Sequence, residues 1–128
     1  MTIELTMLVY SVGLLVIVIA IQATAGILAQ GLPAMAGSRD NLGEPSPFQS
    51  RSKRVAENHK EGLLLFAPLV LAASAAGVST EMTALGAQLF FYSRIAHAVI
   101  YLAGWSWIRP LAWAIGLVGT LMILFALL

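Results

Sequence analysis

Long apolar runs alternate with short polar segments along the chain, and these runs define the predicted elements. A helix needs about 20 mainly apolar residues to cross a bilayer. Uncharged runs cover residues 5–28, 62–80 and 110–128, and a further long run over 82–104 contains only Arg94 and His97 as charged or titratable members. The pattern therefore predicts four transmembrane helices, at about residues 5–28, 58–80, 82–104 and 109–128.

The connection between the first two runs has a different composition. Residues 31–54, GLPAMAGSRDNLGEPSPFQSRSKR, are rich in Pro, Gly and Ser, which predicts a loop. The other connections are short. We expect one all-α domain over residues 1–128, an integral membrane four-helix bundle.

Composition agrees with a membrane protein and excludes several classes. Hydrophobic residues make up 59% of the chain and charged residues 10%, whereas soluble domains carry about 25% charged residues. A net charge of +1 offers no basic patch for nucleic acid, so no nucleic-acid partner is expected. The absence of cysteine excludes a disulfide scaffold, a Cys zinc site and a cysteine nucleophile, and no metal site is predicted.

The basic residues predict the orientation. Every Lys and Arg except Arg94 lies in or beside the first or the third connection. By the positive-inside rule, these two connections are cytoplasmic, and both termini of this multi-pass protein lie outside.

Polar side chains inside the apolar runs are the candidate site. Arg94, His97 and Tyr101 are three and four residues apart, which places them on one helix face. A charge at mid-bilayer costs about 2.5–3.5 kcal/mol on insertion scales. With this orientation, the face lies at the same depth as a second polar face, which begins the second span.

The second polar face consists of Arg54, Asn58 and Glu61, spaced four and three residues apart. Arg109 lies at the same level, next to Pro110 at the start of the fourth helix, where the helix dipole favours an anion.

Each of these residues also has a structural interpretation. Arg54 is equally well explained as an interfacial anchor, and Tyr101 as an interfacial aromatic residue. Arg94 can pair with Glu61 as a structural ion pair, and His97 alone can be a satisfied buried histidine. Their convergence at one depth favours a functional site, since ionisable residues within a membrane mark such sites.

The motifs RSKRVAENHKEGLLLF and SRIAHAVIYLAG, followed by IRP, resemble signatures of the MAPEG family, the membrane-associated proteins in eicosanoid and glutathione metabolism. GSRD at 37–40 is similar to a loop motif of its bacterial members. The resemblance covers roughly residues 37–113. It implies a homotrimer of four-helix subunits, located in this bacterial type in the inner membrane.

The resemblance also implies roles for individual residues. Glutathione, as co-substrate, would bind between neighbouring subunits in the cytoplasmic half of the membrane. Arg54, Asn58 and Glu61 would hold the tripeptide, and Arg94, His97 and Tyr101 would line the opposing wall. Arg109 matches the arginine credited with stabilising the glutathione thiolate, and is thus the expected catalytic residue.

The chain departs from the family pattern at several positions. Glu57, Pro110 and Trp113 stand where the prostaglandin synthase branch has arginine, serine and tyrosine, and Gln30 and Gly31 replace an arginine at the end of the first helix. These differences argue against prostaglandin isomerase activity.

The leading hypothesis is a membrane-bound glutathione transferase or peroxidase that acts on lipophilic electrophiles. Arginines suit the two carboxylates of glutathione, and a glutamate suits its amine. The first alternative is a non-catalytic protein that binds lipid or a partner protein, like the lipoxygenase-activating branch of the family. The second is a purely structural membrane subunit.

Overall fold

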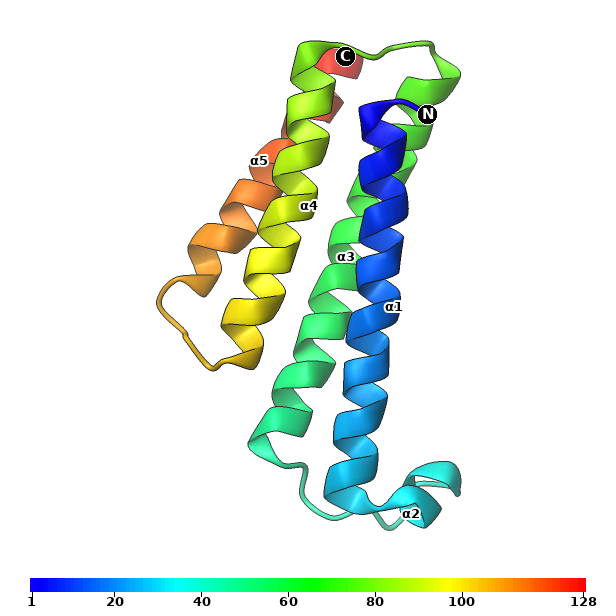
Figure 1. The fold of residues 1–128 in the computed structure, drawn as a ribbon, viewed down its shortest axis with the longest axis vertical. Coiled ribbons are helices and arrows are strands. Elements are labelled where there is room, and N and C mark those ends of the chain that lie inside the picture. Colours follow the sequence, from blue (N-terminus) through cyan, green and yellow to red (C-terminus); the bar gives the residue numbers. More distant parts are fainter.

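The computed structural model describes all residues from 1 to 128 and contains helices and no strands. Four long helices run up and down as a bundle, and both termini lie at the same end (Figure 1). The first and third connections lie at the opposite end. The helices are α1 (Ile3–Gln30), α2 (Leu32–Ala36), α3 (Pro47–Ala75), α4 (Glu81–Leu102) and α5 (Arg109–Leu127).

Local chemistry explains where three of the long helices begin. The Thr2 hydroxyl accepts a hydrogen bond from the Leu5 amide at 3.2 Å at the start of α1. Thr80 and Thr83 form a reciprocal capping box at the start of α4. At the start of α3, the Ser46 hydroxyl accepts from the Gln49 amide at 3.1 Å. Such caps satisfy amide groups that have no partner within the helix.

The predicted loop over residues 31–54 is partly wrong. Residues 32–36 form the short helix α2, and α3 already begins at Pro47. Pro and Ser are frequent in loops, but here Ser46 is the N-cap of α3 and Pro47 is its first residue, a position where proline is favourable. The charged run RSKR therefore lies on a helix. At its other end α3 stops at Ala75, before the predicted end at residue 80.

The core is built by all four long helices. Phe66 of α3 and Phe90 of α4 stack with ring centroids 3.9 Å apart, and Met7 of α1 and Ile123 of α5 pack in the same cluster. A second cluster nearer the α2 end joins α1, α3 and α4. Apolar side chains on the facing surfaces of the long helices therefore hold the bundle together.

Helices α4 and α5 approach closely at two glycines. A Cβ atom at Gly86 would lie 2.6 Å from the carbonyl oxygen of Gly119, and a Cβ at Gly119 would collide with the Gly86 carbonyl in the same way. Small residues at helix crossings in membranes allow this approach of the two backbones.

A buried carboxylate fixes the end of the bundle that carries the termini. Glu4 is 2% exposed. It accepts hydrogen bonds from Ser79 at 3.1 Å to each oxygen and from Thr83 at 2.5 Å. This cluster, the Glu4 clamp, joins the start of α1 to the turn between α3 and α4.

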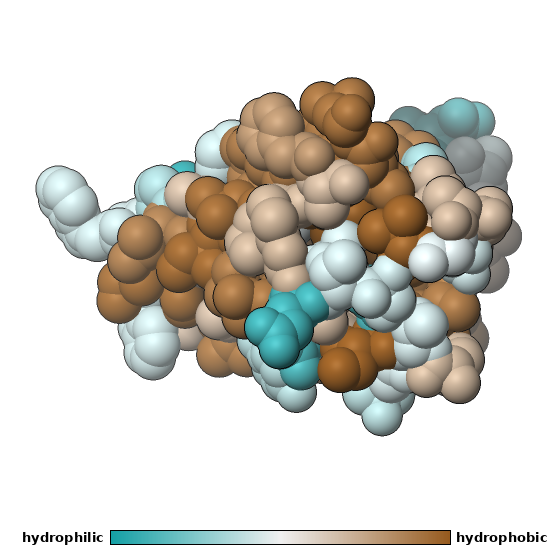
Figure 2. All heavy atoms as spheres, turned by 90° about the horizontal axis from the view of Figure 1, so that it is seen from above, coloured by the Kyte–Doolittle hydropathy of each residue, from teal (hydrophilic) through white to brown (hydrophobic).

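The outer surface of the bundle is apolar. Large hydrophobic side chains such as Val16, Leu64 and Phe125 are 63%, 73% and 61% exposed. Seen from the end that carries the termini, hydrophobic residues cover much of the view, and the most hydrophilic residues on the near side form one small group (Figure 2). Helices α1 and α5 are each long and apolar enough to cross a membrane. That α3 and α4 also cross it, giving four spans, stays a prediction.

The two halves of the bundle differ in length. Helices α1 and α3 contain 28 and 29 residues, and α4 and α5 contain 22 and 19. At 1.5 Å per residue, α1 is about 42 Å long and α4 about 33 Å. Figure 1 shows the lower ends of α1 and α3 extending beyond the connection between α4 and α5.

Candidate functional site

Arg94 is the buried charge at the centre of the candidate site. Its side chain is 3% exposed, and its Nη2 donates a hydrogen bond to Oδ1 of Asn58 at 2.5 Å. Arg94 thus donates its hydrogen bond to Asn58. Glu61, which the sequence analysis gave as a possible ion-pair partner, does not accept it. The Nε atom of Arg94 is buried and has no partner. A buried donor without an acceptor costs free energy, so an acceptor that reached this Nε would be bound favourably.

A groove between α3 and α5 opens beside Arg94. It has a cavity of about 120 Å³, with α4 at its base. Asn58, Glu61 and Arg94 give it one polar side, and Leu65 and Leu117 are among its apolar residues. The groove is therefore amphipathic, and it brings together three residues from two separate predicted motifs.

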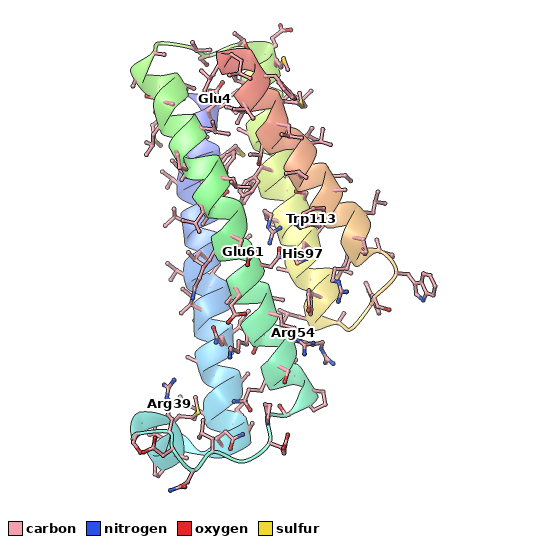
Figure 3. The ribbon with its side chains drawn as sticks, turned by 180° about the vertical axis from the view of Figure 1, so that it is seen from behind. Glu4, Arg39, Arg54, Glu61, His97 and Trp113 are labelled. Carbon is pink, nitrogen blue, oxygen red and sulfur yellow. The ribbon has the colours of Figure 1, made fainter.

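Two glycines and one tryptophan shape this groove. Gly62 and Gly116 line it, and a Cβ at Gly62 would already lie 3.3 Å from the Phe90 ring. Trp113 of α5 is 47% exposed and lines the groove. Figure 3 shows Glu61, His97 and Trp113 at a similar height on three different helices.

His97, Tyr101 and Arg109 form a second group, nearer the connection between α4 and α5. His97 is 2% exposed and meets the Tyr101 ring edge-on, with centroids 5.5 Å apart. The Arg109 guanidinium carbon lies 4.6 Å from the centroid of Tyr101, which is within cation–π range. Tyr101 thereby holds the first residue of α5 against the last turns of α4.

Arg54 lies apart from both groups. It lines a different cavity, of about 450 Å³, between the end of α1, the first connection and the start of α3. Lys53 and Glu57 line the same cavity. In Figure 3, Arg54 lies nearer the α2 end of α3 than Glu61 does. Within one chain, the seven predicted site residues thus form two groups and one separate arginine.

The structural roles of two polar residues, the buried His59 and the partly exposed Gln30, were not predicted from the sequence. His59 is 2% exposed, and its Nε2 lies 2.7 Å from the Ser11 carbonyl oxygen, so this nitrogen donates and α3 is tied to α1. Gln30 donates to the carbonyls of Gly43 and Glu44 and accepts from the Gly43 amide. A lone polar residue at the end of an apolar helix was the available signal for Gln30.

The structure has no group of three or more His, Asp or Glu side chains arranged to hold a metal ion. The groove presents one buried arginine, one exposed carboxylate and one amide beside an apolar wall, an arrangement that can bind a charged polar ligand.

Comparison with known proteins assigns the chain to one family. The family model described as MAPEG family matches residues 5–128, nearly the whole chain. No curated protein and no solved structure matches it.

Proposed function

The chain belongs to the MAPEG family, and from this premise we propose that it is a membrane-bound glutathione transferase or peroxidase acting on lipophilic electrophiles. Membership supports a membrane protein with a function related to glutathione in general. The observation that carries the specific proposal is the groove in which buried Arg94, hydrogen-bonded to Asn58, lies beside Glu61.

The groove offers partners for the charged groups of glutathione. Arg94 is the proposed partner for a carboxylate. Its Nη2 donates to Asn58, and its Nε has no partner within the chain and can donate to the ligand. The exposed carboxylate of Glu61 is the partner for the amine. The apolar side of the groove, with Leu65 and Leu117, takes the electrophile as it arrives from the lipid.

One chain supplies only part of the binding wall. A cavity of about 120 Å³ is smaller than a tripeptide needs, since sites for small molecules usually measure about 300–1,000 Å³. We therefore propose that a second copy closes the groove, in the homotrimer that the family resemblance implies. Arg54, which lines a different cavity from Arg94 within the chain, would then contribute to the groove of a neighbouring subunit.

Arg109 is proposed to stabilise the thiolate. It begins α5, so its charge and the positive end of the helix dipole lie together. Both effects favour an anionic sulfur, which is the reactive nucleophile. The Tyr101 ring fixes the guanidinium at this position.

The test is binding and ionisation of glutathione on the purified protein. Glutathione should raise the melting temperature and give the ultraviolet difference absorbance of a thiolate. Conjugation to a model aromatic electrophile should follow. Binding without a thiolate signal and without conjugation would contradict the transferase proposal and support a non-catalytic binding protein. If the protein did not bind glutathione, glutathione would be excluded as its ligand.

A further inference from the structure

The largest polar cavity of the chain lies outside the groove beside Arg94. It measures about 450 Å³, and Gln22, Gln49, Lys53, Arg54 and Glu57 are among its lining residues. Only two of its eleven lining residues are hydrophobic. A cavity with this lining, at one end of an otherwise apolar bundle, requires a separate explanation.

The wall of this cavity is built by a defined network. The Gln30 side chain makes four polar contacts: its Oε1 accepts from the Gly43 amide, and the two hydrogens of its Nε2 are shared among the Gly43 carbonyl, the Glu44 carbonyl and Gln49 Oε1, the last at 3.3 Å. These bonds hold the first connection against the ends of α1 and α3. The cavity is therefore a formed feature of the fold.

The remaining polar groups of the lining are free to bind a ligand. The side chains of Gln22 and Lys53 make no hydrogen bond or ion pair within the chain. One ammonium group and one amide are donors for the oxygen atoms of an anion. Glu57 adds one carboxylate, which can pair with an ammonium group of the same ligand.

The depth of the cavity matches the headgroup layer of a bilayer. Its lining reaches from the level of Glu57, next to Asn58 and its partner Arg94, down to the first connection. This lower part lies where α1 and α3 extend beyond α4 and α5 (Figure 1). The hydrocarbon layer is about 30 Å thick, close to the length of α4, so the overhang lies among the headgroups.

An apolar strip on α1 leads to the cavity. Val12, Val16 and Ile19 are exposed and are followed at the same three- and four-residue spacing by Gln22. Residues at this spacing share a helix face. Acyl chains lying on this strip would bring the headgroup to the cavity.

From these observations we propose that the cavity between α1, the first connection and α3 binds the phosphate of a membrane phospholipid, with Lys53 as its cationic partner and the Gln22 amide as a second donor. Basic pockets between helices at this depth bind lipid headgroups in other membrane proteins. The proposal is independent of the glutathione proposal. It uses Lys53, which belongs to neither group of residues around Arg94 and Arg109, and it does not use Arg54, which the glutathione proposal assigns to the groove of a neighbouring subunit.

The experiment is native mass spectrometry of the full-length protein in detergent with added lipid. A phospholipid and a diacylglycerol with the same acyl chains are compared, and inorganic phosphate is added alone in a third series. We expect retention of the phospholipid over the diacylglycerol. Lys53→Gln should weaken this retention about five-fold, as expected for one cation near a membrane surface. The matched control is Lys60→Gln, an exposed lysine on α3 outside the cavity.

Three results would overturn the proposal. The first is equal retention of phospholipid by Lys53→Gln and Lys60→Gln. The second is saturation by inorganic phosphate, which would identify a soluble phosphate as the source. The third is displacement of the lipid by glutathione, which would make the cavity part of the thiol site. Glutathione binding by Lys53→Gln should stay at the wild-type level, so failure of the glutathione proposal would be seen separately.

Discussion

At the scale of single residues, the most informative contact is the hydrogen bond between Arg94 and Asn58. A buried arginine at this depth is tolerated because an amide oxygen from the facing helix accepts from it. Breaking one partner of such a contact costs more than replacing both, because the remaining charge stays buried without compensation.

Asn58→Ala should therefore destabilise the protein by about 1–3 kcal/mol, the penalty for a buried donor that loses its acceptor. The double variant Asn58→Leu with Arg94→Met should recover much of that stability and lose glutathione binding. Unfolding in detergent, followed by circular dichroism, measures both effects. Asn41→Ala, in the exposed first connection, is the control. A double variant no more stable than Asn58→Ala would show that the contact contributes a net stabilisation.

Arg109 has a different expected signature. An interaction made mainly in the transition state affects turnover more than ground-state binding. Arg109→Ala should lower conjugation by about 10- to 1000-fold, the range for loss of one electrostatic stabiliser. The dissociation constant of glutathione should change much less. Steady-state kinetics and calorimetry separate the two. Equal losses in binding and turnover would reassign Arg109 to ligand binding.

Tyr101 gives a second way to test the same geometry. Because its ring lies under the Arg109 guanidinium, Tyr101→Leu should reduce turnover, whereas Tyr101→Phe keeps the aromatic face and should retain most of it. Turnover measured at saturating glutathione compares the two variants. If Tyr101→Phe is as impaired as Tyr101→Leu, the hydroxyl and not the ring is required.

At the scale of elements, α4 and α5 depend on their glycine contact. Gly119→Ala would place a methyl group against the Gly86 carbonyl and the Phe90 amide. Overpacking of this kind costs about 1–3 kcal/mol. Gly13→Ala on α1 is the matched control, since no atom lies within 4 Å of its new methyl group. It should be neutral or stabilise by up to about 1 kcal/mol. Melting temperatures of the two variants would be indistinguishable if the contact did not matter.

The sequence was sufficient to predict the helical architecture and which polar residues of different helices lie at the same depth. Long apolar runs located the four long helices, and the depth argument placed Arg94 and Asn58 at one level, where the structure shows them in contact. The start of α3 was missed because Ser46 and Pro47 serve equally in loops and in helix N-termini. Arg54 shares a face of α3 with Asn58 and Glu61 but lies one turn nearer the first connection. The sequence did not show that this connection folds against α1 and α3 to form the second cavity, which Arg54 lines.

At the scale of the whole molecule, the charge distribution predicts how the bundle lies in the membrane. Ser38→Cys in the first connection should be labelled by a membrane-impermeant thiol reagent only after the cytoplasmic side is opened. Ala76→Cys, in the turn at the opposite end, should be labelled from outside. The chain has no cysteine of its own, so each variant reports one position. The opposite labelling pattern would reverse the predicted orientation.

The Glu4 clamp has a consequence for how the protein is made. Glu4 and Thr83, which its carboxylate binds, are separated by 79 positions in the sequence. At about 5–20 residues per second, a ribosome needs roughly 4–16 s to synthesise that interval. During this time the Glu4 carboxylate on the first helix lacks the hydroxyl groups of Ser79 and Thr83, which donate to it in the folded protein. The N-terminal end of the bundle therefore closes late in biosynthesis, after the α3–α4 turn has emerged from the ribosome.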